Sequence, residues 1–348
     1  MKKIMFVSLL VVLATALVIG CARAPSPAAP AAPTTKPAAA PVTLKAVTAW
    51  PKNAPDNDKF MEWIDLVNKE GAGRVTIQYV GGPESIPQGE QVPSLQKGVV
   101  DLVNTAGAYY NNVAPAALAF NASRLRPEQE RKEGFYTMMN QSLAKSGLTY
   151  LARTAAVAPV TYYWTNFPVK SLADFKGKKI RATPTTNPIV EALGGAPVSL
   201  TPGEIYSSME KRLIDAFNQP IMGSTSRAYY EVAKWVIDTP LNQLPVAALM
   251  NLDTFKKLPK DVQDLLLKTS LQIETTVAKY YLTMEAKEAQ ILKDKGVTFV
   301  TLSADDQKWL QDKHDTVYWD PVVKGDTEFG QKLKDLAFTG KTLDRGPE

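Results

Sequence analysis

Cysteine and histidine are almost absent from this sequence. Its 348 residues include one cysteine, Cys21, and one histidine, His314. These scarcities exclude a disulfide framework, and they disfavour a Cys/His metal site and a Cys-His or Ser-His-Asp catalytic centre. Blocks of one charge are absent too, because 40 basic and 35 acidic residues are interspersed along the chain. With no basic stripe interleaved with aromatics and no zinc-finger spacing, we predict no nucleic-acid partner.

The N-terminus has the pattern of an export signal. Two lysines precede the apolar run IMFVSLLVVLATALVI at residues 4–19, which is short for a membrane-spanning helix. Val18 and the Gly-Cys pair that ends at Cys21 resemble the lipobox of bacterial lipoproteins, in which the cysteine is lipidated and begins the mature protein. The resemblance implies a signal peptide over residues 1–20 and a lipid anchor in the membrane through Cys21. A plain secretory signal, in which Cys21 is incidental, is the alternative.

The segment after the cysteine is built from alanine and proline. Residues 21–42 contain almost no large apolar side chain, so they cannot join a hydrophobic core. Their prolines favour extended polyproline II, and we therefore predict a semi-rigid tether. The globular domain follows over residues 43–348, and no later apolar run approaches the length of a membrane span.

The globular part begins by alternating strands and helices. Alternating and β-branched runs predict strands at residues 43–50 and 74–82, and helical spacing of apolar residues predicts a helix at residues 57–71 between them. A third, apolar strand is predicted at residues 99–105. This order favours an open α/β lobe with parallel strands and crossover helices.

A second lobe and a long helix follow. Extended segments rich in Thr and aromatics at residues 149–169 mark a crossing into a lobe that repeats the order of strand, helix and strand. Residues 260–295 have uninterrupted helical spacing without Pro or Gly, long enough to cross both lobes. We therefore predict a two-lobed α/β fold, with lobe 1 over residues 43–160 plus C-terminal segments and lobe 2 over residues 161–250. A ligand cleft between the lobes is expected, with hinge closure around the ligand.

A family resemblance covers nearly all of the globular part, from Thr43 to about Gly340. The segment SLADFKGKKIRATPTTNPIVEALGGAPVSLTPGEIYSSMEKRLIDAFNQP resembles the signature region of the TRAP (tripartite ATP-independent periplasmic) solute-binding proteins. There a D-[LF]-K-G-x-K-[IL]-R strand is followed by a helix and an ending close to [VI]-D-[AG]. Three more segments fit the family at the expected distances, PSLQKGVVDLV, AYYEVAKWVI and LDTFKKLPKDVQDLLLKTS. The resemblance implies a two-lobed, type II-like periplasmic-binding-protein fold.

The resemblance also implies a function. Family members are extracytoplasmic receptors, in the periplasm or at the outer face of the cell membrane, that close over an organic acid and deliver it to a small and a large membrane subunit. The arginine of the signature strand binds the ligand carboxylate in that family, and the matching residue is Arg181. A guanidinium suits this task, because it presents a planar fork to a carboxylate and keeps its charge. The alternative is a surface arginine with a local acidic partner.

Three departures from the family remove charge from the predicted cleft. Members that bind sialic acid carry a Glu and an Arg just after the third strand, where this chain has Ala106 and Tyr109. They carry another Arg upstream of the signature strand, where this chain has Thr161. These replacements argue against sialic acid and against any ligand that needs several ion pairs.

A fourth departure concerns metal binding. A branch of the family that takes 2-oxo acids and lactate, sometimes through a metal ion, shows D-A-x-E-[WF] where this chain has DAFNQP. Asn218 replaces the glutamate and removes the anionic oxygen that a hard cation prefers, so we predict no metal and no cofactor. Gln219 matches a position where other members place a ligand-contacting Asn, and its amide serves a hydroxyl or a carboxylate oxygen.

Aromatic residues complete the predicted site. Trp50, at the end of the first strand, matches a ligand-facing position, and Tyr162 and Trp164 lie close to Thr161 in the sequence. Core packing is the alternative for all three. One arginine, amides for polar oxygens and ring faces for the remainder favour a monocarboxylate with an apolar or aromatic body.

Two other functions are alternatives to a transport receptor. The chain has no nucleophile elbow, no histidine with suitable partners and no acid pair at a known spacing, so we predict that it is not an enzyme, although carboxylate-pair catalysis is the less favoured alternative. A sensory co-receptor for a membrane sensor would share the fold, and the sequence does not separate it from a transport receptor. His314 and the charged run EQERKEG at residues 128–134 are predicted to lie on the solvated surface.

Overall fold

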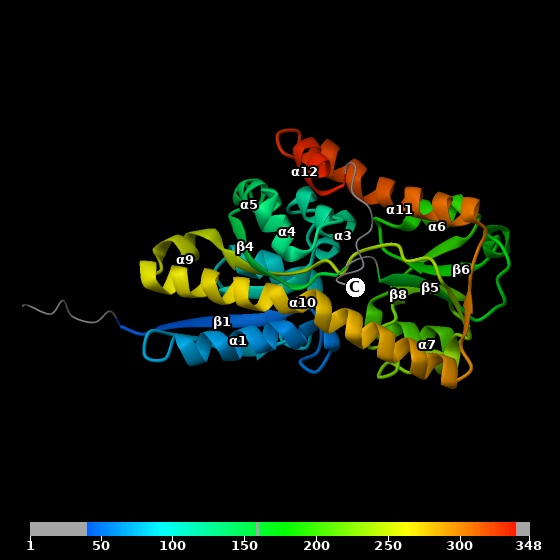
Figure 1. Ribbon diagram of the computed structural model, residues 1–348, viewed down its shortest axis with the longest axis horizontal. Coiled ribbons are helices and arrows are strands. Elements are labelled where there is room, and N and C mark those ends of the chain that lie inside the picture. The colour runs from blue at the N-terminus through cyan, green and yellow to red at the C-terminus, as the bar shows by residue number, and fades with distance from the viewer. Residues whose placement is uncertain (1–39, 158–159, 339–348) are drawn as a thin grey trace, which may run out of the picture. The chain divides into compact units, whose positions relative to one another are not determined.

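The computed structural model describes residues 40–157 and 160–338. The predicted signal peptide, the lipidation site at Cys21 and most of the Ala/Pro-rich tether therefore lie outside the described residues. The globular part is mixed α/β and contains two sheets, each with helices packed around it (Figure 1). Where the chain is described, no helix combines the length and the apolar character needed to cross a membrane.

The first sheet forms lobe 1 and has five strands in the order β2-β1-β3-β10-β4. Strand β1 pairs in parallel with β2 and β3, whereas β10 runs antiparallel to β3 and β4. The strand bounds are β1 Val42–Thr48, β2 Val75–Gly81, β3 Leu102–Ala106, β4 Leu148–Ala155 and β10 Val246–Asn251. The parallel β1 and β3 bring their carboxyl ends to one edge of the sheet, and that edge faces the candidate site described below.

The second sheet forms lobe 2 and has six strands in the order β11-β9-β5-β8-β6-β7. Strand β6 is parallel to β7 and β8, and β5 runs antiparallel to β8 and β9. The strand bounds are β5 Thr161–Thr165, β6 Lys179–Ala182, β7 Ala196–Ser199, β8 Ala216–Pro220, β9 Trp235–Ile237 and β11 Thr298–Val300. The chain leaves this sheet after β9 and returns to lobe 1 as β10, so several segments connect the lobes.

Helices cover both sheets. Their bounds are α1 Asp58–Glu70, α2 Gln91–Gln96, α3 Ala119–Ala122, α4 Pro127–Lys132, α5 Phe135–Ala144, α6 Asn187–Ala192, α7 Ile205–Glu210, α8 Tyr229–Val232, α9 Leu252–Lys257, α10 Lys260–Asp294, α11 Ala304–Gly325 and α12 Gly330–Ala337. Helix α1 illustrates why they form, because Phe60, Trp63, Ile64 and Val67 recur at helical spacing and are all buried. Gly71 then ends the helix.

The predicted long helix is confirmed. Helix α10 has 35 residues and, at about 1.5 Å per residue, is about 50 Å long. One part packs against α1, α4 and β4 of lobe 1. Further along, Glu285 and Glu288 accept hydrogen bonds from Tyr162 and from the backbone N–H of Thr225, both in lobe 2. The helix therefore ties the two lobes together, as its path in Figure 1 shows.

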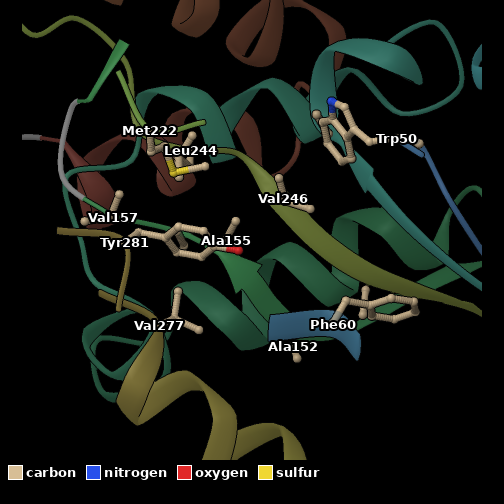
Figure 2. Close-up of a cluster of buried hydrophobic side chains, with 14 of the residues drawn as sticks. Trp50, Phe60, Ala152, Ala155, Val157, Met222, Leu244, Val246, Val277 and Tyr281 are labelled. Carbon is tan, nitrogen blue, oxygen red and sulfur yellow. The ribbon is translucent and has the colours of Figure 1, made fainter. Parts of the chain in front are cut away.

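The largest hydrophobic core also runs through both lobes. It includes Leu44 and Ile77 from the first sheet and Trp164 and Phe217 from the second. Figure 2 shows part of this core, in which Ala155 of lobe 1 lies beside Tyr281 of α10, with Trp50 and Val246 of lobe 1 and with Met222 and Leu244. Because these side chains are buried against one another, the strand ends that carry the candidate site are held in defined positions.

The prediction of a solvated charged run at residues 128–134 is wrong at its centre. Glu130 is fully buried and forms a salt bridge with Arg153 of β4, and Arg131 pairs with Glu274 of α10. Burial raises the pKa of Glu274 to about 7, although the hydrogen bond and charge of Arg131 oppose this rise. Glu130 and Arg131 turn inward toward partners that lie 23 and 143 residues away in the sequence, which no local pattern indicates.

His314 is also buried rather than exposed. It lies on α11 with no exposed surface, and its ring packs edge-on against Tyr163. Its Nδ1 lies 2.8 Å from Oδ1 of Asn242. Helix α11 has polar residues on most of its surface, so the sequence carried no sign that this position turns inward.

Candidate functional site

One pocket is lined by side chains from both lobes, and its cavity volume is about 110 Å³. Trp50 and Tyr109 of the lining follow β1 and β3, two parallel strands of lobe 1. Arg181 and Asn218 lie on β6 and β8, two parallel strands of lobe 2. In open α/β sheets the carboxyl ends of parallel strands are the usual ligand-binding edge, and here such edges from two sheets meet.

Arg181 is the basic residue of this lining. Its side chain is enclosed by β6 and its neighbours, and the residue is 8% exposed. Nε donates a hydrogen bond to the carbonyl of Leu200 at 3.0 Å. Within residues 40–157 and 160–338, the two terminal nitrogens make no hydrogen bond and no salt bridge. A guanidinium has five N–H donors, so most of its hydrogen-bonding capacity faces the pocket unused.

Tyrosine hydroxyls surround this charge. Burial raises the pKa of Tyr109 and of Tyr318, both of which line the pocket, and the charge of Arg181 opposes each rise. Burial also raises the pKa of Tyr229 to about 12, again against the effect of nearby arginines. These phenols therefore stay neutral near pH 7 and leave the positive charge of Arg181 uncompensated.

Asp56 is the acidic residue of the described lining, and it already has a partner. It lies in the 3-10 helix Pro55–Asn57 of lobe 1, and its carboxylate forms a salt bridge with Arg227, in the loop before α8 in lobe 2. This pair links the lobes beside the pocket. Because Arg227 neutralises Asp56, the described lining retains one excess positive charge, that of Arg181.

The part of the chain that the structure describes contains no cluster of metal-binding side chains. No group of three or more His, Cys, Asp or Glu side chains comes close enough there to hold an ion. Asn218, which stands where a glutamate would offer an anionic oxygen, instead presents a buried Nδ2 that has no hydrogen-bond partner. An amide nitrogen is a donor, so it suits a ligand oxygen rather than a cation.

Most of the predicted ligand-binding residues line the pocket, namely Trp50, Tyr109, Arg181, Asn218 and Gln219. Trp50 also belongs to the hydrophobic core, with 8% of its surface exposed. It therefore both packs in the core and lines the pocket, the two roles that the sequence left open. The rings of Trp50 and Tyr109 lie 5.9 Å apart at 59° and form an aromatic wall.

Tyr162 and Trp164 lie outside the pocket lining. Side chains alternate between the two faces of β5, so Thr161 and Tyr163 line the pocket whereas Tyr162 and Trp164 point to the opposite face. The hydroxyl of Tyr162 donates to Glu285 of α10. Trp164 stacks on Phe217, and its Nε1 donates to the carbonyl of Gln219 at 3.2 Å.

Several lining residues were not among the predicted ligand-binding residues, notably Asn121, Tyr163, Asn242 and Tyr318. Strand alternation from Thr161 would have found Tyr163. The two asparagines carry no comparable signal, because one lies on the four-residue helix α3 and the other on an irregular segment between β9 and β10. Only the fold brings these segments together.

The sequence matches a known family over most of its length. Residues 46–323 fit the model of the bacterial extracellular solute-binding proteins, family 7 (DctP). This chain belongs to that family. A curated relative of this family 7 protein is the uncharacterized protein YiiZ of Salmonella typhimurium, 24% identical over 266 residues, which cover 72% of this chain and 79% of YiiZ.

Solved structures confirm the fold of this family 7 protein. A TRAP periplasmic solute-binding protein from Desulfovibrio salexigens with bound orotic acid superposes with a TM-score of 0.73 at 18% identity, over 84% of this chain and 96% of that one. An extracytoplasmic solute receptor from Bordetella pertussis that binds pyroglutamic acid gives a TM-score of 0.72 at 20% identity, over 85% and 99% of the two chains. The fold is therefore that of the TRAP solute-binding proteins. The family is one of solute receptors, not of enzymes.

Proposed function

We propose that this chain is the extracytoplasmic receptor of a TRAP-type transporter and binds a small organic monoanion through Arg181. The observation that carries the proposal is a buried guanidinium whose terminal nitrogens have no partner among the described residues. A charge removed from water needs a counter-charge, and a ligand carboxylate supplies one in the matching planar geometry. A single excess positive charge in the described lining favours a monocarboxylate over a dicarboxylate.

The body of the ligand is compact and largely apolar. The faces of Trp50 and Tyr109 offer ring contacts to an aromatic or aliphatic body. The cavity of about 110 Å³ is of the order of the apolar cavity of about 150 Å³ that holds benzene. Orotic and pyroglutamic acid, which two structural neighbours bind, are compact ring acids.

Polar atoms on β8 orient the ligand. The unpartnered Nδ2 of Asn218 donates to a ligand oxygen, and Gln219 offers a second amide from the same strand. Tyr162 and Trp164 act from behind the pocket, because Trp164 holds the backbone of Gln219 and Tyr162 ties β5 to α10. Their contribution is to the position of the ligand contacts rather than to contact itself.

Delivery requires that the receptor stays near its membrane partners. Lipidation of Cys21 after removal of residues 1–20, followed by the tether over residues 21–42, would hold the binding domain at a membrane surface. Labelling cells with a radioactive fatty acid tests this arrangement. The label should enter the wild-type protein and be absent from Cys21→Ser, and an unlabelled wild-type protein would refute lipidation.

Calorimetry across a panel of acids tests the ligand class. Compact aliphatic, cyclic and aromatic monocarboxylates should bind more tightly than sugar acids and dicarboxylates. Arg181→Lys should keep the fold yet lose most of the affinity, because an ammonium does not reproduce the bidentate fork. Arg74→Lys, at an exposed arginine paired with Asp261, is the matched control and should bind normally. Tightest binding of a sugar acid, or unchanged affinity in Arg181→Lys, would refute the proposal.

A further inference from the structure

Two neighbouring side-chain amides of the pocket lining, those of Asn242 and Gln243, differ in how many hydrogen bonds they make. Gln243 donates from Nε2 to the carbonyls of Ser123 and Leu125, each at 2.9 Å, and accepts at Oε1 from Arg153 at 2.6 Å. The side chain of Asn242 has one hydrogen bond to a described residue, between its Oδ1 and Nδ1 of His314. Its Nδ2 is buried without a partner among the described residues, and Asn242 lines the pocket at 3% exposure. Gln243 is therefore a structural residue, whereas Asn242 keeps a free donor.

His314 accounts for the orientation of this amide. Burial lowers the pKa of His314 to about 3, so the imidazole is neutral at physiological pH. With its proton on Nδ1, the ring donates to Oδ1 of Asn242 and leaves the amide nitrogen for the pocket. Tyr163 packs against the other face of this arrangement, edge-on to the ring. A histidine so enclosed is a positioning residue, because it acts on the pocket through Asn242.

A free acceptor lies close to this free donor. Asn121 is 7% exposed and lines the pocket, and its Oδ1 is buried without a partner. Its backbone carbonyl accepts from the N–H of Gln243 at 3.1 Å, which places Asn121 beside the segment that carries Asn242. Buried polar atoms without partners are uncommon in folded proteins, and a donor and an acceptor on adjoining segments of one pocket lining suit a ligand group that both accepts and donates.

We infer that the solute is a small carboxylic acid that also carries a secondary amide, either a ring lactam or an open-chain amide. Its carbonyl oxygen accepts from Nδ2 of Asn242, its N–H donates to Oδ1 of Asn121, and its carboxylate binds Arg181. The inference rests on the proposed function for the carboxylate contact and adds the chemical class of the remaining ligand. A plain hydrocarbon at this position would leave both asparagine atoms unsatisfied, which a site built for hydrogen bonding discriminates against.

Matched pairs of acids test the inference by calorimetry. Pyroglutamate and cyclopentanecarboxylate share ring size and carboxylate, and only pyroglutamate has the amide. N-acetylglycine and pentanoate form an open-chain pair. In the wild-type protein the amide member of at least one pair should bind about tenfold more tightly or better, which corresponds to about 1.4 kcal/mol. Equal binding within both pairs, or no detectable binding of either amide acid, would overturn the inference.

Variants test which residues cause the preference for the amide-containing acids. Asn242→Leu keeps the branching of the side chain, at a larger volume, but lacks the donor, so the affinities within each pair should come to within about twofold of each other. His314→Phe should reduce the preference, and His314→Gln, whose amide N–H can still donate to Asn242, should restore it. A preference that survives Asn242→Leu would overturn the assignment. If His314→Phe does not fold, the Asn242→Leu comparison and the ligand pairs still decide.

The two proposals fail in different ways. Tight, Arg181-dependent binding of a monocarboxylate without an amide, combined with equal binding within each pair, refutes the amide inference and leaves the proposed function intact. Amide-selective binding that is unchanged in Arg181→Lys refutes the role of Arg181 and with it the proposed function. Selective binding that depends on both Arg181 and Asn242 supports both.

Discussion

Two buried arginines on strands of the two lobes have opposite surroundings. Arg153 on β4 is fully buried, pairs with Glu130, and donates from Nη2 to Oε1 of Gln243 at 2.6 Å and to the carbonyl of Leu244 at 3.1 Å. Arg181 on β6 is 8% exposed and has one described partner, the carbonyl of Leu200. Both guanidinium groups are largely removed from water, yet among the described residues only Arg153 has a counter-charge.

The fold neutralises the charge of Arg153, whereas we propose that a bound ligand neutralises the charge of Arg181. Desolvation of an ion costs several kcal/mol, which a hydrogen-bonded partner of opposite charge offsets. In lobe 1 the partner is part of the fold, so the ion pair connects β4 to α4 and stabilises the lobe. In lobe 2 no such partner is present where the structure is described, which is why we propose that an anion from outside completes the site.

The largest expected effect is on the structural arginine. Arg153→Met should lower the free energy of unfolding by about 3–5 kcal/mol, because it leaves Glu130 buried without its partner. Urea denaturation measures the change, and Arg74→Met at an exposed position is the control, with a change within about 0.5 kcal/mol. A loss below about 1 kcal/mol at Arg153 would show that this pair is not what stabilises lobe 1.

Replacing Arg181 should have the opposite effect on stability from replacing Arg153. Arg181→Met should leave the free energy of unfolding without ligand unchanged or higher, because it removes a buried charge that has no described counter-charge. Ligand at about 100 times its Kd should stabilise the wild-type protein by about 2.7 kcal/mol and the variant hardly at all. Thermal denaturation with and without the bound acid gives both numbers. If the variant without ligand unfolded as easily as Arg153→Met, the two arginines would share one structural role.

His314 extends the comparison to a group that can lose its charge. Burial lowers its pKa to about 3 from an ordinary value near 6.5, so the unfolded chain takes up a proton that the folded protein refuses. This contribution to stability is present above pH 6.5 and is lost as the pH falls toward 3, by about 1.4 kcal/mol per pH unit. Arg181 cannot lose its proton in this way, so only an anion neutralises its buried charge.

The pH effect is measured against a variant that cannot titrate. Between pH 6.5 and 4.5 the wild-type protein should lose stability relative to His314→Gln, and the two should keep a constant difference above pH 7.5. Asp315, whose pKa burial raises to about 6, has the opposite trend but is common to both proteins and cancels in the difference. A constant difference at all pH values would mean that folding does not change the pKa of His314.

The smallest effect is expected for the exposed cations beside Arg181. Lys176, Lys178 and Lys179 precede it in the same basic stretch, and Lys179 donates from Nζ to the carbonyl of Arg212 at the surface. Replacing all three with Gln should change ligand affinity by less than about threefold and stability by about 0.5 kcal/mol or less at each position. Calorimetry at low and high salt measures this. A loss comparable to that in Arg181→Lys would mean that the stretch binds the anion as a diffuse basic surface.

Elements with a strong local pattern were predicted well. The helix expected at residues 260–295 is α10, Lys260–Asp294, because uninterrupted apolar periodicity is a local property. The strand with Arg181 was likewise found from a contiguous motif. No helix or strand was predicted between β3 and β4, and the short helices α3 and α4 of this segment carry Asn121 and Glu130, which matter to the pocket and to lobe 1.

The sequence by itself determined the α/β alternation, the long helix and the family to which the chain belongs, because each depends on residues that are neighbours in the chain. Tertiary structure alone decided which charges are buried and paired. Arg153 has Glu130 beside it, whereas the described partner of Arg181 is the backbone carbonyl of Leu200. Desolvation and counter-charge arise from contacts between segments far apart in sequence, such as Asn242 and His314, and no local pattern contains them.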